Sequence, residues 1–295
     1  MNKKLRALLS RLPIERFRNP PPVVAVVSLR GVIGGVGPFR RGLTLPTLAG
    51  LLERAFRLSD VKAVALAINS PGGAAVQSAL IATRIRALAE EHKVPVLAFA
   101  EDVAASGGYW LATAADEIYA DESSIIGSIG VISAGFGFPE ALKRLGIERR
   151  VYTAGEHKNP LDPFLPEQPD ELDHLKRLQA DVHEAFCRQV RARRGDRLQG
   201  DEEIFSGRFW SGKAALERGL IDGIGDLRGV LRHRFGEKVR LRLMEDGRRW
   251  WQRRFGLPRT WTGAGRGTAP GMASELAGEL IAGIEERAWW SRFGL

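Results

Sequence analysis

Short apolar runs alternate with longer segments of helical spacing through the first part of the chain. Runs such as VVAVVSLRGVI are rich in β-branched residues and predict buried strands, whereas the segments between them repeat apolar residues every three or four positions, as helices do. The order strand, helix, strand, helix, strand, helix falls on residues 23–33, 43–58, 61–69, 78–91, 94–100 and 107–115. This alternation predicts right-handed crossovers and a mainly parallel sheet covered on both faces, which is an α/β fold.

The rest of the chain adds shorter strands and one long helix. The segments DEIYAD, SIGVISA and ERRVYT predict strands at 116–121, 128–134 and 148–153. A long amphipathic helix is predicted at 169–195. Its apolar stripe consists of Leu175, Leu178, Val182 and Phe186. The segment GKAALERGLID (212–222) predicts a further helix that ends at Gly219.

Both ends of the chain differ in character from its centre. Residues 1–17 predict a short amphipathic helix with leucines on one face and Lys/Arg on the other, and the NPPP that follows stops it. The stretch TGAGRGTAPG predicts a flexible linker before a last amphipathic helix at 273–290. The chain therefore divides into a basic N-terminal segment with its proline linker, a central domain and a basic C-terminal extension with a terminal helix, at 1–22, 23–235 and 236–295.

Composition narrows the range of functions. No apolar run reaches 18 residues, so we expect no membrane-spanning helix. The single cysteine, Cys187, excludes an internal disulfide and is not enough for a zinc site, and we expect neither a metal nor a cofactor. This cysteine usage fits a cytoplasmic location.

The net charge of +9 is concentrated near the ends of the chain. Residues 1–18 carry six Lys/Arg against one Glu, and residues 228–266 carry twelve against three acids. Basic segments of this kind indicate either a solvated face or contact with an anionic surface. We expect residues 1–17 to hold the protein loosely on the inner face of the cell membrane, and the alternative is a disordered tail. We expect no specific nucleic-acid partner.

Two glycine-rich turns directly follow predicted strands, and both fall where α/β folds place their active sites. They are NSPGG at 69–73 and AASGG at 104–108. A serine at a helix N-terminus has unpaired N–H groups beside it, so Ser106 would be a nucleophile, and the N–H groups of Gly107 and Gly73 would form an oxyanion hole. The alternative is a small-residue turn that only solves a packing problem.

A nucleophilic serine needs a base, and few of the histidines in this chain are suitable candidates. His174 and His183 fall on the long amphipathic helix, and only His157, in TAGEHKNPLDP, lies in a turn suited to a triad. Its neighbour Lys158 is the other candidate, because a lysine held in an apolar site gives up its proton readily and serine–lysine pairs are a variant of the triad.

Five motifs, taken together and in this order, resemble those of the S49 peptidases, the signal peptide peptidase A family. They are INSPGG, ASGGYWLA, SIIGSIGV, AGEHKNPLDPF and the downstream FSGRFWSGKAALERGLIDGIG. The resemblance covers about residues 23–225. It implies a Clp protease/crotonase-like spiral of ββα units. It also implies a Ser–Lys dyad of Ser106 as nucleophile and Lys158 as general base, with Gly73 and Gly107 as the oxyanion hole and Ser128 orienting the lysine. The lysine would come from a later strand or from a neighbouring subunit.

The resemblance implies a serine endopeptidase that cleaves peptides, including membrane-derived or signal-peptide remnants. Family members typically begin with a membrane-spanning segment, where this chain has only a basic amphipathic helix. A crotonase-like acyl-CoA enzyme and a non-catalytic scaffold of the same fold are the alternatives. The crotonase-like enzyme would need a carboxylate acid/base and would leave Ser106 and Lys158 without a role. We expect a homo-oligomer, because such a fold buries one face by packing subunits. The helix at 273–290 is expected to dock on protein, and the alternative is that it packs on its own domain.

Overall fold

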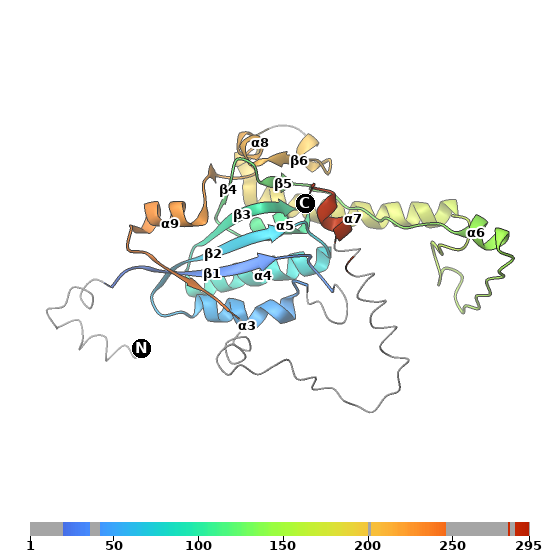
Figure 1. Ribbon diagram of the computed structural model, residues 1–295, viewed down its shortest axis with the longest axis horizontal. Helices are drawn as coiled ribbons and strands as arrows, with labels where there is room; N and C mark the ends of the chain where they lie inside the picture. Colours follow the sequence, from blue (N-terminus) through green and yellow to red (C-terminus); the bar gives the residue numbers. More distant parts are fainter. Residues whose placement is uncertain (1–19, 36–41, 200–201, 246–282, 284–286, 295) are drawn as a thin grey trace, which may run out of the picture.

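A computed structural model of the protein describes residues 20–35, 42–199, 202–245, 283 and 287–294 (Figure 1). The predicted N-terminal helix at 1–17, the linker at 262–271 and most of the helix predicted at 273–290 lie outside these residues. In the part of the chain that is described, no helix is long and apolar enough to cross a membrane.

From residue 23 to residue 112 the described residues form strands and helices in alternation, as the sequence pattern predicts. In order, the elements of the described chain are β1 (Val23–Arg30), α3 (Leu45–Phe56), β2 (Val61–Ser70), α4 (Ala75–His92), β3 (Val96–Ala105), α5 (Gly107–Ala112), β4 (Glu117–Ala120), β5 (Ile125–Gly127), α6 (Pro139–Arg144), α7 (Pro169–Arg194), the 3-10 turns Gly195–Arg197 and Glu202–Phe205, β6 (Phe209–Ser211), α8 (Gly212–Glu217), β7 (Gly223–Ile224), α9 (Leu227–Phe235) and β8 (Arg240–Leu243). The helices at 43–58, 78–91 and 169–195 are confirmed, with ends that differ by a few residues.

The strands join in one sheet that divides at β3. The main order is β6-β5-β3-β2-β1-β8, and all pairs are parallel except β5 with β6. The first half of β3 pairs with β4, which in turn pairs with β7, whereas the last three residues of β3 pair with β5. This arrangement confirms the predicted α/β class and its mainly parallel sheet. The division also lets β3 and β5 end side by side, so the residues that follow these two strands lie close together.

The core lies mainly on one face of this sheet. Helices α3, α4 and α5 cover that face, and Leu66, Ile68, Ile81, Ile85 and Tyr109 are completely buried there. A smaller cluster on the opposite face packs around Phe99 and Leu231, the latter from α9. Because β2 is covered on both faces, its residues read as a continuous apolar run.

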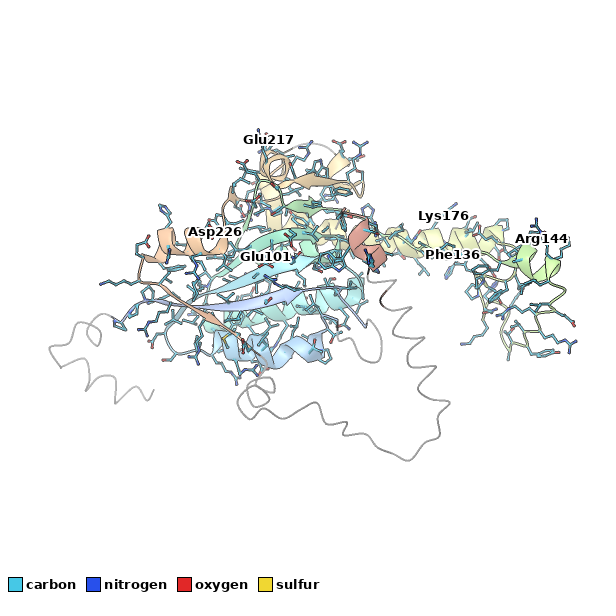
Figure 2. The ribbon with its side chains drawn as sticks, viewed as in Figure 1. Glu101, Phe136, Arg144, Lys176, Glu217 and Asp226 are labelled. Atoms are coloured by element: carbon cyan, nitrogen blue, oxygen red, sulfur yellow. The ribbon has the colours of Figure 1, made fainter. Side chains whose placement is uncertain are left out.

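Residues 131–168, here called the arm, project from the body together with the first half of α7 (Figure 1). The buried residues of α7 all lie in its second half, namely Phe186, Cys187, Val190 and Arg194. Figure 2 shows Phe136 and Arg144 on the arm, well away from Glu101 in the body. The strands predicted at 128–134 and 148–153 are wrong, since neither segment is a strand in the structure. A strand needs a neighbour that takes its backbone hydrogen bonds, and within the described chain these two segments have none.

The base of the arm is fixed to the body by the C-terminal end of α7. Arg194, with a side chain only 2% exposed, donates from Nη1 and Nη2 to the two carboxylate oxygens of Asp222 at 2.7 and 3.0 Å, and from Nε to the Gly219 carbonyl at 2.9 Å. Burial raises the pKa of Asp222, but the hydrogen bonds from Arg194 and the Ile118 N–H outweigh it and the net pKa is lowered. The carboxylate is therefore ionised at neutral pH and holds α7 in place.

Candidate active site

Ser106 occupies a strained corner between a strand and a helix. It follows β3 and precedes α5, with φ 52° and ψ −123°, a region that non-glycine residues rarely adopt. Its N–H donates to the Gly127 carbonyl at 2.8 Å, and its carbonyl accepts from the Trp110 N–H at 3.0 Å. Its Oγ makes no hydrogen bond with any described residue. A strained corner costs about 1–3 kcal/mol and is typical of positions where a side chain must be presented to a substrate.

The glycines of the neighbouring turn allow it to touch this corner. A Cβ on Gly72 would lie 2.7 Å from the Cβ of Ser106 and 2.8 Å from the Gly107 nitrogen. Gly73 has φ 139°, and a Cβ there would lie 2.1 Å from the Ile33 carbonyl oxygen. Only glycine fits these two positions, so the turn after β2 packs directly against the turn after β3.

The backbone N–H groups of Gly73 and Gly107 are available to a ligand. Between Ile33 and this turn, the Ile33 N–H donates to the Gly72 carbonyl and the Ala74 N–H donates to the Ile33 carbonyl, which leaves the Gly73 N–H free. Gly107 is the first residue of α5, where N–H groups have no partner within the helix. Among the described residues neither group has a hydrogen-bond acceptor. Two free donors beside a serine Oγ can stabilise a negative charge on a carbonyl oxygen.

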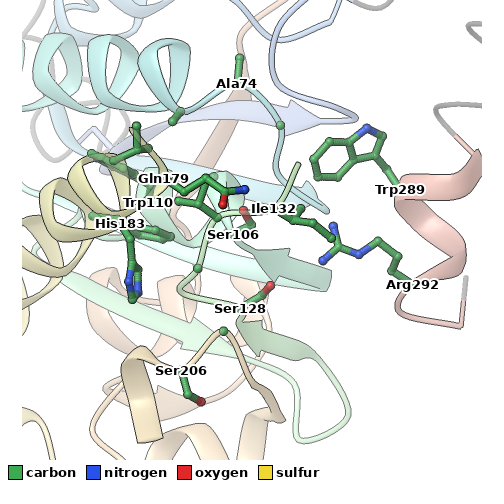
Figure 3. Close-up of a pocket in the computed structure, with 18 of the residues that line it drawn as sticks. Ala74, Ser106, Trp110, Ser128, Ile132, Gln179, His183, Ser206, Trp289 and Arg292 are labelled. Carbon is green, nitrogen blue, oxygen red and sulfur yellow. The ribbon is translucent and has the colours of Figure 1, made fainter. Parts of the chain in front are cut away.

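Ser106, Gly107 and Gly73 line one pocket of about 680 Å³ together with Ser128 (Figure 3). Ser128 follows β5, has φ 53° and donates its N–H to the Arg208 carbonyl at 2.7 Å. The stacked rings of Trp110 and Phe186, with centroids 4.6 Å apart, form part of the wall. Four of the five predicted site residues therefore meet in this pocket.

Lys158, the fifth predicted residue, lies elsewhere in the chain. It is exposed on the arm and does not line the pocket. Its N–H donates to the Gly155 carbonyl at 3.3 Å, in a turn of the arm. Within one chain the structure therefore does not bring Lys158 to Ser106.

The loop that carries Lys158 is nevertheless organised around a carboxylate. Asp162, with a side chain 1% exposed, accepts from the Phe164 N–H at 3.0 Å, from Arg149 Nε at 2.8 Å and from Asn159 Nδ2 at 2.6 Å. The Phe164 N–H above all, together with Arg149 and Asn159, lowers the pKa of Asp162. The Arg149 guanidinium also lies 4.8 Å from the ring centroid of Phe164. The tip of the arm thus has its own polar core.

The pocket also contains residues to which the sequence analysis gives no role in the site. His183 of α7 lines it, with Nε2 3.2 Å from the Ile129 carbonyl oxygen, so the proton on that nitrogen is directed to the backbone. Trp289 and Arg292 line it from the far end of the chain (Figure 3). His183 could have been found from its position beside the apolar stripe of α7. No periodic signal connects residues 289 and 292 with Ser106.

Comparison with known proteins identifies relatives of the chain. The model of peptidase family S49 matches residues 89–238, just over half of the 295 residues. The chain is 36% identical over 209 residues to "Serine protease SPPA, chloroplastic" of Arabidopsis thaliana, covering 69% of this chain and 31% of that protein. It is 32% identical over 220 residues to "Protease 4" of Haemophilus influenzae, covering 74% of this chain and 35% of that protein.

A third relative carries a different name. The chain is 49% identical over 293 residues, or 99% of its length, to a Brucella abortus protein named "Na(+)/H(+) antiporter NhaA". The matched stretch is 39% of that protein. The chain thus spans well under half the length of these three relatives, and their names describe larger proteins.

Proposed function

The chain belongs to peptidase family S49, and on this premise we propose that it is a serine peptidase in which Ser106 attacks the scissile carbonyl of a peptide. The observation that carries this proposal is the pocket in which the unbonded Oγ of Ser106 lies with the free N–H groups of Gly73 and Gly107. A strained serine beside two free donors is the arrangement that acyl transfer needs.

The chemistry follows from this geometry. A base accepts the Ser106 proton while Oγ forms a bond to the carbonyl carbon, and the carbonyl oxygen becomes an oxyanion held by the N–H groups of Gly73 and Gly107. Each such donor is worth about 10²–10³ in rate in serine proteases. The C–N bond then breaks, and the base returns its proton to the leaving amine. The same base takes a proton from a water molecule that attacks the resulting ester, the bond between Oγ and the carbonyl carbon breaks, and the proton passes to Oγ as the acid product leaves.

We further propose that Lys158 of a neighbouring copy is that base. The pocket contains no lysine among its described lining residues, while Lys158 lies exposed at the end of a projecting arm. The arm carries apolar side chains that water surrounds in a single chain, including Phe136 at 82% exposure and Tyr152 at 90%. A second copy would cover these side chains and supply a partner for the strand-like segments at 128–134 and 148–153. Ser128, in the pocket but without a bonded partner for its Oγ among the described residues, would then orient the lysine.

The substrates we propose are extended peptides with apolar side chains, such as membrane-derived or signal-peptide remnants. The pocket walls include Trp110, Val131, Ile132 and Phe186, which suit apolar and aromatic side chains. The crotonase-like alternative would require a carboxylate at the reacting centre, and the described lining contains no Asp or Glu. Peripheral attachment to the inner face of a membrane through residues 1–17 remains part of the proposal, on the basis of their charge and leucine stripe.

The identity of the base is tested by substitutions of Lys158 and His157, with the hydrolysis of an apolar peptide as the assay. Lys158→Ala should lose activity because the base is removed. Lys158→Arg should lose activity because a guanidinium does not give up its proton at accessible pH. His157→Ala should stay active.

The matched control for the lysine is Lys143→Ala, an exposed lysine of α6 on the same arm, which should behave as wild type. His183→Ala addresses the histidine in the pocket. An inactive, folded His183→Ala beside an active Lys158→Ala would contradict the Ser–Lys assignment and indicate a Ser–His enzyme.

A further inference from the structure

The segment at residues 287–294 packs at the mouth of the pocket, although it lies far from Ser106 in the sequence. Phe293 is buried against Val103, Ala105 and Ile125, and its ring meets that of Phe209 edge to face at 5.2 Å. Val103 and Ala105 belong to β3, which ends just before Ser106, and Ile125 belongs to β5, which ends just before Ser128. The segment is therefore attached to the two strands that position the site.

This segment gives the pocket its only charged lining residue among those described. Trp289 and Arg292 both line the pocket, and Figure 3 shows the Arg292 side chain extending from the segment toward Ile132. The remaining described lining residues include no Asp, Glu or Lys and no second Arg. Arg292 forms no ion pair within the described chain. Its guanidinium carbon lies 5.5 Å from the Trp289 ring centroid and 6.0 Å from that of Phe293, distances at which cation–π attraction favours this placement.

An unpaired guanidinium at the edge of an apolar pocket is suited to bind an anion. Arginine presents planar paired donors that match a carboxylate, and hydrogen bonds to ionised groups are about twice as strong as those between neutral groups. The walls formed by Trp110 and Ile132 favour apolar side chains, so a substrate that satisfies both features is an apolar peptide with one carboxylate nearby.

We propose that Arg292 is a specificity determinant that binds a substrate carboxylate beside the scissile bond, either an Asp or Glu side chain or the free C-terminus of a short peptide. The proposal rests on the peptidase function proposed above. A charge-assisted hydrogen bond of this kind raises kcat/KM for the carboxylate-bearing substrate about 10-fold to 100-fold over its neutral counterpart. The apolar walls and Ser106 act on both substrates alike.

The test compares peptides that share one apolar core. The neutral reference has an amidated C-terminus and no acid. One series places Glu at each position flanking the scissile bond with the end amidated, and another keeps the neutral core with a free C-terminal carboxylate, so the two sources of a carboxylate are distinguished. A Lys series in the same positions completes the set.

Four full-length proteins are compared by kcat/KM on these peptides: wild type, Arg292→Gln, Arg292→Glu and the control Arg287→Gln, an exposed arginine of the same segment that does not line the pocket. Wild type and Arg287→Gln should prefer a Glu peptide or the free carboxylate by about 10-fold or more. Arg292→Gln should lose that preference, and Arg292→Glu should prefer Lys. Equal preferences in all four proteins would overturn the proposal, as would an equal rise on every peptide in Arg292→Gln, which would make the segment a plug.

A binding measurement separates this proposal from the catalytic one. Peptide affinities are measured by calorimetry for Ser106→Ala with and without Arg292→Gln, where no turnover is needed. A carboxylate preference that Arg292→Gln removes would support the specificity role even if Ser106 were not the nucleophile. Unchanged affinities beside normal labelling of wild-type Ser106 by a fluorophosphonate would reject the role of Arg292 and leave the peptidase assignment intact.

Discussion

Replacing Ser106 by alanine abolishes peptide hydrolysis in this account while leaving the protein folded. Loss of the covalent nucleophile removes on the order of 10⁴-fold or more of the rate in serine proteases. The backbone at Ser106 is held by the Gly127 carbonyl and the Trp110 N–H, neither of which depends on the hydroxyl, so the corner should persist with a methyl group in its place. Turnover of an apolar peptide is measured alongside circular dichroism and thermal unfolding.

Ser123→Ala is the control for this substitution, since Ser123 is an exposed serine outside the pocket around Ser106. It should keep wild-type turnover. A purified, folded Ser106→Ala protein that retained more than a few per cent of wild-type turnover would show that another group performs the attack.

Two inactive variants should restore each other if the dyad is shared between subunits. Ser106→Ala keeps a functional Lys158, and Lys158→Ala keeps a functional Ser106, so an assembly that contains both can pair an intact serine of one copy with an intact lysine of the next. Random mixing in a closed symmetric assembly gives about one quarter of the wild-type number of complete sites. Activity should therefore rise from background in each variant alone to about that fraction after co-expression.

The control for restoration is the chain with both substitutions, co-expressed with Ser106→Ala or with Lys158→Ala, which should remain inactive. Light scattering of the wild type at micromolar concentration should show an oligomer. Mixed assemblies of the two single variants that form normally but recover nothing would place the lysine in the same chain as the serine or remove it from catalysis.

The sequence predicts the body of the fold well because its strands are buried on both sides. A short continuous apolar run such as that of β2 is typical of a strand buried on both faces, and the elements from β1 to α5 lie close to where the pattern predicts them. The same reasoning fails at 128–134 and 148–153, where an apolar alternation is present but no neighbouring strand exists within the described chain. The spacing of apolar residues indicates which side chains are buried in the folded protein. It does not indicate whether the surface that buries them belongs to the same chain or to another copy.

The candidate site divides in a similar way. Gly73, Ser106 and Gly107 follow strands that end at one edge of a parallel sheet, so their meeting in one pocket could be predicted from local pattern. Ser128 is a candidate only through the resemblance to S49 peptidases, because a serine after a short strand has no distinctive local signal. No sequence pattern predicts the place of Arg292, because it depends on the burial of Phe293 against β3 and β5. The pairing of Lys158 with Ser106 stays a prediction.

The nucleophilic role of Ser106 is tested most directly by the site of covalent modification by a fluorophosphonate, a reagent selective for activated serines. The wild-type protein is treated with the probe, digested and mapped by mass spectrometry, with Ser106→Ala and Ser123→Ala in parallel. We expect a single adduct on Ser106 in wild type and in Ser123→Ala, and none in Ser106→Ala. No adduct on the active wild-type protein, or an adduct on a different serine, would contradict it.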